Sequence, residues 1–280
     1  MGTISIDQIS SMNMIYNRFT FEYFLESTAR LGFKSFELWA GSPQFCNYDS
    51  NVSGVARIRR LVEQSGLKIT CVTGEQAIYA VNMAARDEKL RQASIEYFKT
   101  LIRQAGELGV DKYLMSIGWG CYDETLEESW KRGCDSGEQV LKEAERSGVN
   151  ILWEVMPKYT TSHIHDLASA KRIVHDLDSP YSRLCVDTCA IAVVNEPLEI
   201  YFRELRDKVY HIHLNDGSPD TWVTWGDGTQ NVDEHLHTLA KYDYKDTISL
   251  EVGDPSYMRD PEDALRRGRA YLMKHLPYTV

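Results

Sequence analysis

The sequence predicts a single α/β domain over residues 1–280, folded as a closed (β/α)8 TIM barrel. The length is close to the ~250 residues that are typical of one such barrel. Eight apolar, β-rich runs alternate with amphipathic helical segments along the chain, which is the pattern of a parallel sheet with crossover helices. A doubly wound open sheet is the alternative, and the count of eight runs favours closure into a barrel.

The eight expected strands are almost continuously apolar, as in strands that are covered on both faces. They span residues 3–9, 34–40, 67–73, 111–118, 150–156, 183–187, 209–214 and 247–252. Four strands follow a Leu-Gly or Ser-Gly pair at the end of a polar helical segment. We expect these glycines in the left-handed position just beyond a helix. They are Gly32, Gly66, Gly109 and Gly148.

Helical segments between the strands carry apolar residues at helical spacing, with charged residues between them. The clearest segments are 19–31, 88–108, 126–147 and 261–276. Each is expected to pack its apolar face against the sheet and to leave its charged face in water.

Composition excludes several classes of partner. The net charge of −10 repels the phosphates of nucleic acid and anionic membrane surfaces. No apolar stretch approaches the ~20 residues that a membrane-spanning helix needs. The six cysteines are scattered without a CxxC pair, and residues 1–14 lack the features of a signal peptide. We therefore expect a reduced, cytoplasmic protein without nucleic-acid or membrane partners.

Four polar residues interrupt four of the apolar runs, and they are the strongest functional signal in the chain. They are Glu154 in ILWEVM, Asp187 in RLCVD, His213 in YHIHLND and Glu251 in TISLEVG. A charged group costs several kcal/mol in such surroundings unless a partner neutralises it. Three carboxylates and one imidazole form an oxygen-rich ligand set, which suits Mn²⁺ or Mg²⁺ better than structural zinc.

The expected strand order brings these four residues together. Each lies late in its strand, and residues at the carboxyl ends of barrel strands form the active site. The strands are the fifth to the eighth, so their ends are neighbours and can converge on one ion. A structural ion pair or a helix cap explains any single acid equally well. His211 shares a strand face with His213 one layer deeper, and we interpret it as a support or a substrate contact.

Several other residues near strand ends are weaker candidates for substrate contacts. Aromatic rings at such positions stack on sugars, although packing or a subunit contact is the more frequent role. Acidic residues there bind hydroxyl groups, or else start a helix or a loop. The candidates are Trp39, Glu75, Trp119, Asp216 and Trp225. His163 and His165, in TTSHIHD, are interpreted as part of a solvated loop rather than as a second metal site.

The chain resembles the xylose-isomerase-like family of sugar isomerases and epimerases, and within it the fructoselysine 3-epimerases. The resemblance covers most of the sequence, including ELWAGSP, VNMAARDE, VDTCA, HIHLND and ISLEVG. It implies that Glu154, Asp187, His213 and Glu251 bind a divalent metal and that Glu154 and Glu251 exchange the substrate proton. The expected cation is Mn²⁺, with Mg²⁺, Co²⁺, Zn²⁺ or Ni²⁺ as alternatives. The expected reaction inverts C3 of a ketose or substituted ketose in a homo-oligomeric enzyme.

Two departures bear on the substrate. Several epimerases of free ketohexoses have a histidine three residues after the metal-binding Asp and an arginine six residues after the metal-binding His. This chain has Ala190 and Pro219 there, which argues against a simple free-hexulose epimerase. Alternatives within the family are an aldose–ketose isomerase and a metal-dependent lyase that cleaves C-glycosides. A non-catalytic sugar-binding subunit and an endonuclease remain weaker alternatives, the latter opposed by the negative charge.

Overall fold

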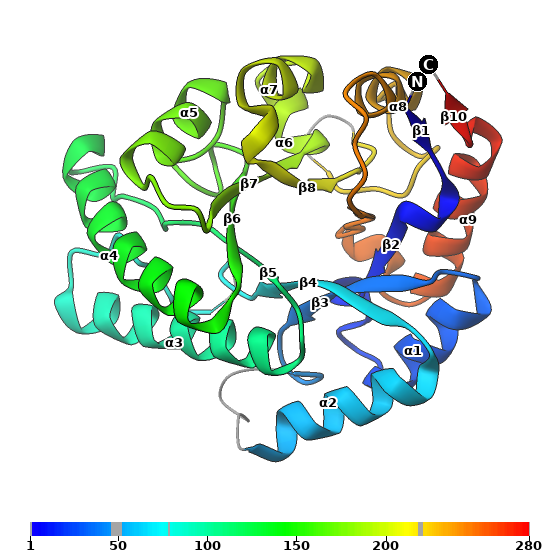
Figure 1. The fold of residues 1–280 in the computed structure, drawn as a ribbon, viewed down its shortest axis with the longest axis horizontal. Helices are drawn as coiled ribbons and strands as arrows, with labels where there is room; N and C mark the ends of the chain where they lie inside the picture. Colours follow the sequence, from blue (N-terminus) through cyan, green and yellow to red (C-terminus); the bar gives the residue numbers. More distant parts are fainter. Residues whose placement is uncertain (1, 46–51, 78, 218–220, 280) are drawn as a thin grey trace.

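Eight parallel strands form a closed barrel in chain order, surrounded by helices (Figure 1). The computed structural model describes residues 2–45, 52–77, 79–217 and 221–279. The barrel strands are β2 (Ile9–Met12), β3 (Ser35–Ala40), β4 (Lys68–Gly74), β5 (Lys112–Met115), β6 (Asn150–Val155), β7 (Ser182–Asp187), β8 (Val209–His213) and β9 (Ile248–Ser249). The prediction of a closed barrel is confirmed, and the open-sheet alternative is wrong.

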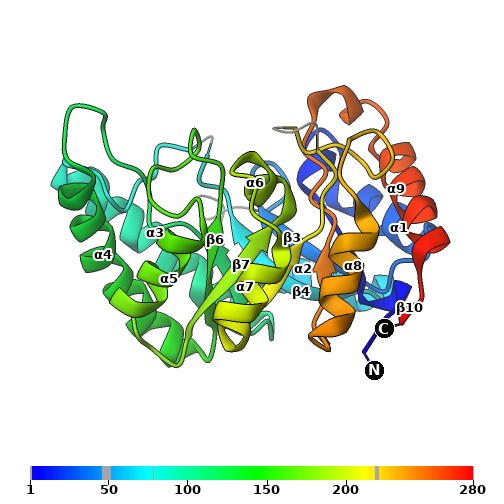
Figure 2. The ribbon, with the colours of Figure 1, turned by 90° about the horizontal axis from the view of Figure 1, so that it is seen from above.

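The helices lie outside the ring of strands, and the loops after the strands gather at one end of the barrel (Figure 2). The helices are α1 (Phe21–Arg30), α2 (Val52–Ser65), α3 (Glu88–Glu107), α4 (Leu126–Ser147), α5 (Leu167–Asp176), α6 (Thr188–Val193), α7 (Leu198–Leu205), α8 (Val232–Lys241) and α9 (Pro261–His275). The four segments predicted as helices agree with α1, α3, α4 and α9 to within two residues at either end.

The glycine pattern in the sequence is confirmed. Gly32, Gly66, Gly109 and Gly148 have φ between +67° and +83°, in the left-handed region where a side chain is strained. Each one ends the helical segment before a barrel strand and turns the chain back toward the sheet.

The first predicted strand is wrong in position. Residues 3–9 were expected in the barrel, but β1 (Thr3–Ile4) pairs with β10 (Tyr278–Thr279) in a separate antiparallel ribbon. Between β1 and the first barrel strand, β2, residues 6–8 form a single 3₁₀ turn. The Gln8 side chain then donates hydrogen bonds to the carbonyls of Tyr244 and Asp246. This anchor ends the turn, so the barrel strand begins only at Ile9, and the two chain ends lie side by side (Figures 1 and 2).

The interior of the barrel is apolar at one level and polar at the next. Cys71, Leu114, Leu152 and Cys185 form a small buried cluster inside the ring of strands. Side chains of a strand alternate between its two faces, so residues two positions further along point into the same interior. Those residues are Thr73, Ser116, Glu154 and Asp187. The apolar layer therefore closes the barrel beneath a layer of polar side chains at the carboxyl ends of the strands.

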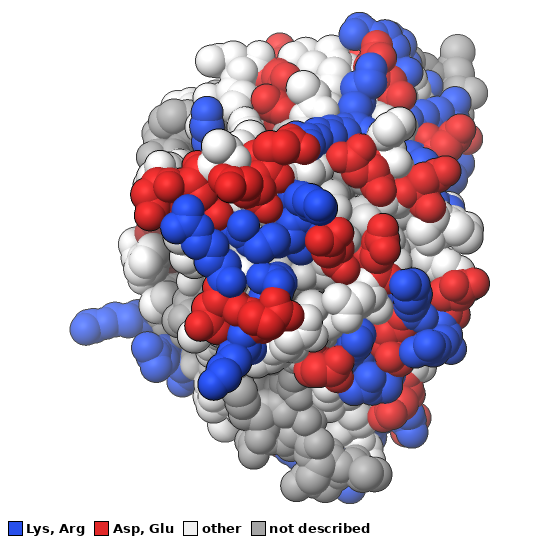
Figure 3. Space-filling view, turned by 90° about the vertical axis from the view of Figure 1, so that its left-hand side faces the viewer, with Lys and Arg blue, Asp and Glu red and all other residues white. Residues whose placement is uncertain are grey.

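The outer face over α3, α4 and α5 carries interspersed acidic and basic side chains (Figure 3). Ion pairs account for part of this pattern: Arg172 contacts Glu127 and Asp176, and Arg103 contacts Glu143. This face therefore offers no continuous basic track for a phosphate backbone among its described residues. None of the described helices has the length and apolar character that crossing a membrane requires.

Candidate metal centre

Four side chains converge at the mouth of the barrel: Glu154, Asp187, His213 and Glu251. One ligand atom from each lies within 4.8 Å of the others. The His213 Nδ1 atom is 3.0 Å from a Glu251 oxygen, 3.1 Å from a Glu154 oxygen and 3.9 Å from an Asp187 oxygen. His213 is fully buried, and Glu251 is the most exposed of the four side chains. The structure thus brings together the four residues that the sequence singled out.

Strand register explains this convergence. Asp187 pairs directly with His213 across β7 and β8, and Glu154 is the neighbour of Cys185 across β6 and β7. Ser249 of β9 pairs with His213, and Glu251 follows it by two residues. Because the strands are parallel and adjacent, their carboxyl ends deliver all four side chains to one point.

Hydrogen bonds from the following loops hold two of the acids in place. Asp187 accepts bonds from the backbone N–H groups of Cys189 and Ala190 at the start of α6. Its other oxygen accepts from the Asn215 amide at 3.1 Å and from the Trp222 indole at 2.8 Å. The Asn215 side chain also accepts the N–H of Glu251 at 2.8 Å. Asn215 therefore links two of the three acids in this cluster, through the Asp187 carboxylate and the Glu251 backbone.

Glu37 of β3 is a buried member of the site that the sequence analysis missed. Its carboxylate lies 3.1 Å from His213 Nε2 and 2.8 Å from His211 Nε2, and it accepts a hydrogen bond from the Thr73 hydroxyl. If Nε2 of His213 carries the proton that Glu37 accepts, Nδ1 is left with a lone pair facing the three acids. The signal was available, because Glu37 interrupts the apolar run SFELWA just as the other four residues interrupt theirs.

His211 lies beneath this cluster, as the two-residue period predicts. It is fully buried, and its Nε2 contacts both Glu37 and the Ser249 hydroxyl at 3.0 Å. Burial lowers the pKa of His211, so its neutral form is favoured. Its contact with Glu37, one layer below His213, fits the predicted role as a support.

The electrostatics of the cluster call for a cation. Burial raises the pKa of Glu154 and of Glu251, and burial together with the nearby Glu251 raises the pKa of Asp187 to about 7. Glu37 behaves in the opposite way: burial would raise its pKa, but His213 and His211 outweigh burial and hold it well below its usual range. Burial would lower the pKa of His213, but Cys185, Glu37 and Glu251 outweigh burial and raise it well above its usual value. A positive charge at this point, whether an imidazolium or a bound divalent cation, therefore stabilises the three carboxyl groups.

The donor set fits a small, hard divalent ion. Ligands on opposite sides of an ion with bonds of ~2.1 Å lie ~4.2 Å apart, which matches side chains gathered within 4.8 Å. Two other clusters share His213, one with Glu37 and His211 and one with Glu154 and Cys185. The first is already satisfied by its internal hydrogen bonds. In the second, burial raises the pKa of Cys185 and disfavours the thiolate that binds metals.

The predicted substrate contacts lie in different surroundings. Trp39 and Glu75 are buried together, and the indole N–H of Trp39 donates to Glu75 at 2.9 Å. Asp216 accepts bonds from the backbone of Gly217, Gly226, Gly228 and Gln230, so its oxygens hold a loop. Trp225 is buried against Tyr271, and its N–H donates to the Leu214 carbonyl. These contacts give Asp216 and Trp225 structural roles, and only Trp119 of this group is substantially exposed.

Comparisons with known proteins agree with this geometry. A family model described as a xylose isomerase-like TIM barrel matches residues 25–275. Fructoselysine 3-epimerase from Shigella flexneri is 27% identical over 266 residues, which cover 92% of this chain and 95% of that protein. The structure of 3-keto-D-glucoside 4-epimerase from E. coli superposes with a TM-score of 0.80 at 19% identity, covering 95% of this chain and 99% of the other.

A second solved structure, D-psicose 3-epimerase with D-tagatose from Clostridium cellulolyticum, superposes with a TM-score of 0.78 at 18% identity. The alignment covers 95% of this chain and 97% of that one. At this identity the two superpositions establish the fold. The curated relative and the matched family agree with the prediction of an isomerase-class enzyme.

Proposed function

Because this chain belongs to the xylose isomerase-like TIM barrel family, we propose that it is a divalent-metal-dependent sugar epimerase that inverts C3 of a ketose or substituted ketose. One observation carries the proposal. Glu154 and Glu251 reach the same His213 nitrogen, at 3.1 and 3.0 Å, from strands that are separated by β7 and β8. Two carboxylates that approach one point from different sides are what proton exchange on two faces of a carbon requires.

In the proposed reaction, one of these glutamates removes the proton from C3 and the other returns a proton to the opposite face. A divalent cation held by Glu154, Asp187, His213 and Glu251 would supply Lewis-acid stabilisation of the negative charge left on the sugar. Manganese is the ion that we propose first, on the chemistry of the donor set. Burial raises the pKa of both glutamates, which brings a carboxyl group closer to the range that suits general acid–base work.

The relatives support a ketose substrate, and the chain itself argues for a substituted one. One relative is a fructoselysine 3-epimerase, and fructoselysine is a fructose that carries a lysine substituent. Ala190 is buried where several free-hexulose enzymes have a sugar-binding histidine, and Pro219 lies outside the described residues. We propose that the enzyme is cytoplasmic and homo-oligomeric. The five described cysteines are free thiols, which is consistent with a reducing compartment.

The test is deuterium exchange. The Mn²⁺-loaded protein is incubated in D₂O with fructoselysine, with D-fructose and with other substituted ketoses, and C3 is followed by NMR. Deuterium at C3 together with the inverted product is the expected result. Migration of the carbonyl to C1 would instead identify an aldose–ketose isomerase, and release of an aglycone would identify a lyase. Either outcome, or no exchange with any ketose, contradicts the proposal.

A further inference from the structure

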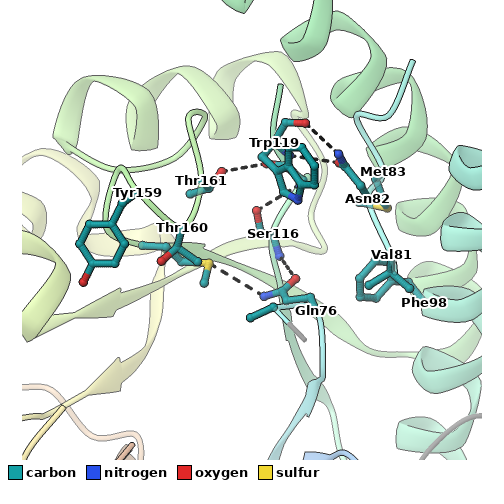
Figure 4. Close-up of a pocket in the computed structure, with 13 residues that line it drawn as sticks. Gln76, Val81, Asn82, Met83, Phe98, Ser116, Trp119, Tyr159, Thr160 and Thr161 are labelled. Atoms are coloured by element: carbon teal, nitrogen blue, oxygen red, sulfur yellow. Dashed lines mark hydrogen bonds between the residues drawn. The ribbon is translucent and has the colours of Figure 1, made fainter. Parts of the chain in front are cut away.

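A cavity of about 290 Å³ lies beside the metal centre, over the carboxyl ends of β4, β5 and β6 (Figure 4). Met156, which lines it, follows Glu154 by two residues at the end of β6. Gln76 and Ser116 follow β4 and β5 and line the same cavity. Glu154 and this cavity are therefore both at the carboxyl ends of the strands, and Met156 links them along β6.

An exposed indole on a well-anchored backbone borders this cavity. Trp119 is 47% exposed, although its backbone is fixed on both sides by one buried amide. The Asn82 side chain accepts the N–H of Trp119 at 3.1 Å and donates to its carbonyl at 2.9 Å (Figure 4). The preceding Gly118 makes this contact possible: it has φ +94°, and a Cβ there would lie 2.2 Å from the Asn82 oxygen. The backbone that carries this indole is therefore fixed at the rim of the cavity.

The lining is uncharged and mixes polar with apolar side chains. Among the described residues, the lining includes no Lys, Arg, His, Asp or Glu. Gln76 accepts the N–H of Ser116 at 2.8 Å through its oxygen, while its amide nitrogen is 4.0 Å from the Met156 sulfur, a weak acceptor. That amide therefore has hydrogen-bond donors to offer inside the cavity. The hydroxyl groups of Ser116 and Thr160 add to the polar lining.

An uncharged lining favours neutral over charged substituents of a bound sugar. The charged end of an amino acid would enter without a counter-charge, and burying an unpaired charge is costly. A sugar ring has hydroxyl groups that can hydrogen-bond to the Gln76 amide and to the Ser116 and Thr160 hydroxyls. Its apolar face can stack on the Trp119 indole. The volume is near the lower end of the ~300–1,000 Å³ of ligand pockets, which suits one ring. We propose that the cavity binds a neutral, hydroxyl-bearing substituent of the ketose, namely a second sugar ring stacked on Trp119.

This inference rests on the proposed function, so its test includes a measurement that needs no turnover. Binding of D-fructose, fructoselysine, 1-O-glucosyl-fructose and 6-O-glucosyl-fructose to the Mn²⁺-loaded protein is measured by calorimetry, alongside C3 deuterium exchange. We expect one glucosyl-fructose to bind at least about tenfold more tightly than D-fructose and fructoselysine. Tighter binding of fructoselysine than of both glucosyl-fructoses, or no binding of either, overturns the inference. If binding follows the expected order and no ketose exchanges deuterium, only the proposed reaction fails.

Substitution of Trp119 separates stacking from folding. Trp119→Ala is expected to remove about tenfold of the affinity for the glucosyl-fructose and to leave D-fructose binding unchanged, while Trp119→Phe restores most of the loss. Tyr122→Ala is the matched control, because Tyr122 is a nearby aromatic residue that is 98% exposed and does not line this cavity. Equal losses for all ligands in Trp119→Ala, or an equal loss in Tyr122→Ala, contradicts the assignment. Thermal unfolding of each variant confirms that it is folded.

Discussion

The two halves of the barrel mouth are built alike and differ in chemistry. The ends of β6 to β9 direct three carboxylates toward one imidazole nitrogen. The ends of β4 and β5 instead carry Gln76 and Ser116, beside an indole that is held by Asn82. The later half thus gathers acids around one point, whereas the cavity in the earlier half has an uncharged lining. Under the proposed function, the reacting carbon would lie over the later strands, and the earlier strands would select what is attached to it.

The largest effect is expected from the acids of the later half. Glu154→Gln and Glu251→Gln each preserve shape and remove the group that we propose for proton transfer. Such groups contribute ~10²–10⁴-fold to a rate, so C3 deuterium exchange should fall by at least about 10²-fold in each variant. The affinity for Mn²⁺ should fall as well, because each side chain also belongs to the proposed ligand set.

Glu75→Gln is the matched control in the earlier half. Glu75 is also buried after a strand, but its oxygens accept bonds from Trp39 and from the Ala77 backbone. We expect this variant to lose less than about tenfold in exchange rate. An equal loss in Glu75→Gln, or near-normal exchange in either of the other two variants, would remove the distinction between the halves.

A smaller effect is expected at Glu37, which belongs to the earlier half but serves the later one. Glu37→Gln weakens the bond that orients His213, and groups that orient a metal ligand contribute ~10–100-fold to metal affinity. Calorimetric titration with Mn²⁺ should show a loss in that range. Nitrogen NMR of His213 should show that its Nε2–H tautomer is less favoured.

Thr73→Val is the control for Glu37, because it removes a hydrogen bond to the same carboxylate without touching His213. Its effect on Mn²⁺ affinity should be smaller than that of Glu37→Gln. If Glu37→Gln binds Mn²⁺ as tightly as the wild type, Glu37 has no part in positioning His213.

The architecture and the candidate ligands were predictable from the sequence because both depend on local pattern. Alternation of strands and helices defines the barrel, and a charged residue in an apolar run is conspicuous wherever it occurs. Glu37 carries the same signal but was not singled out, because its strand is not one of the four neighbouring strands whose ends were expected to bind the ion. Strand 3–9 was misplaced because TISI resembles a strand, and only the distant anchor of Gln8 shows where the barrel begins.

Roles that depend on long-range partners were less predictable. Asp216 and Trp225 have the residue types of a sugar site, but their hydrogen bonds go to the backbone of loops. The interpretation of His163 as part of a solvated loop was wrong, because it is buried. Its Nδ1 contacts the Gly118 carbonyl at 2.8 Å, and its Nε2 contacts the Ser129 hydroxyl at 2.9 Å. It thus supports the segment that carries Trp119.

The titration of His163 should change stability rather than turnover. Burial lowers its pKa to about 4 from the usual 6.5. Between those values the unfolded chain binds a proton and the folded one does not, so the free energy of unfolding decreases as the pH falls from 6.5 to 4. This histidine should contribute at most about 1.4 kcal/mol per pH unit in that range. Chemical unfolding of the wild type and of His163→Gln across this range gives the free energy of unfolding at each pH. The contribution of His163 is the difference between the two slopes of that free energy against pH. Equal slopes would contradict it.

The most direct test of the account is the position of a bound ion. Crystals of the protein grown with saturating Mn²⁺ are measured at the manganese absorption edge. The account predicts one anomalous peak per chain at the barrel mouth, about 2.0–2.3 Å from His213 Nδ1 and from oxygens of Glu154, Asp187 and Glu251. A peak held by other residues, or none at this point while the four side chains keep their arrangement, would contradict the central claim.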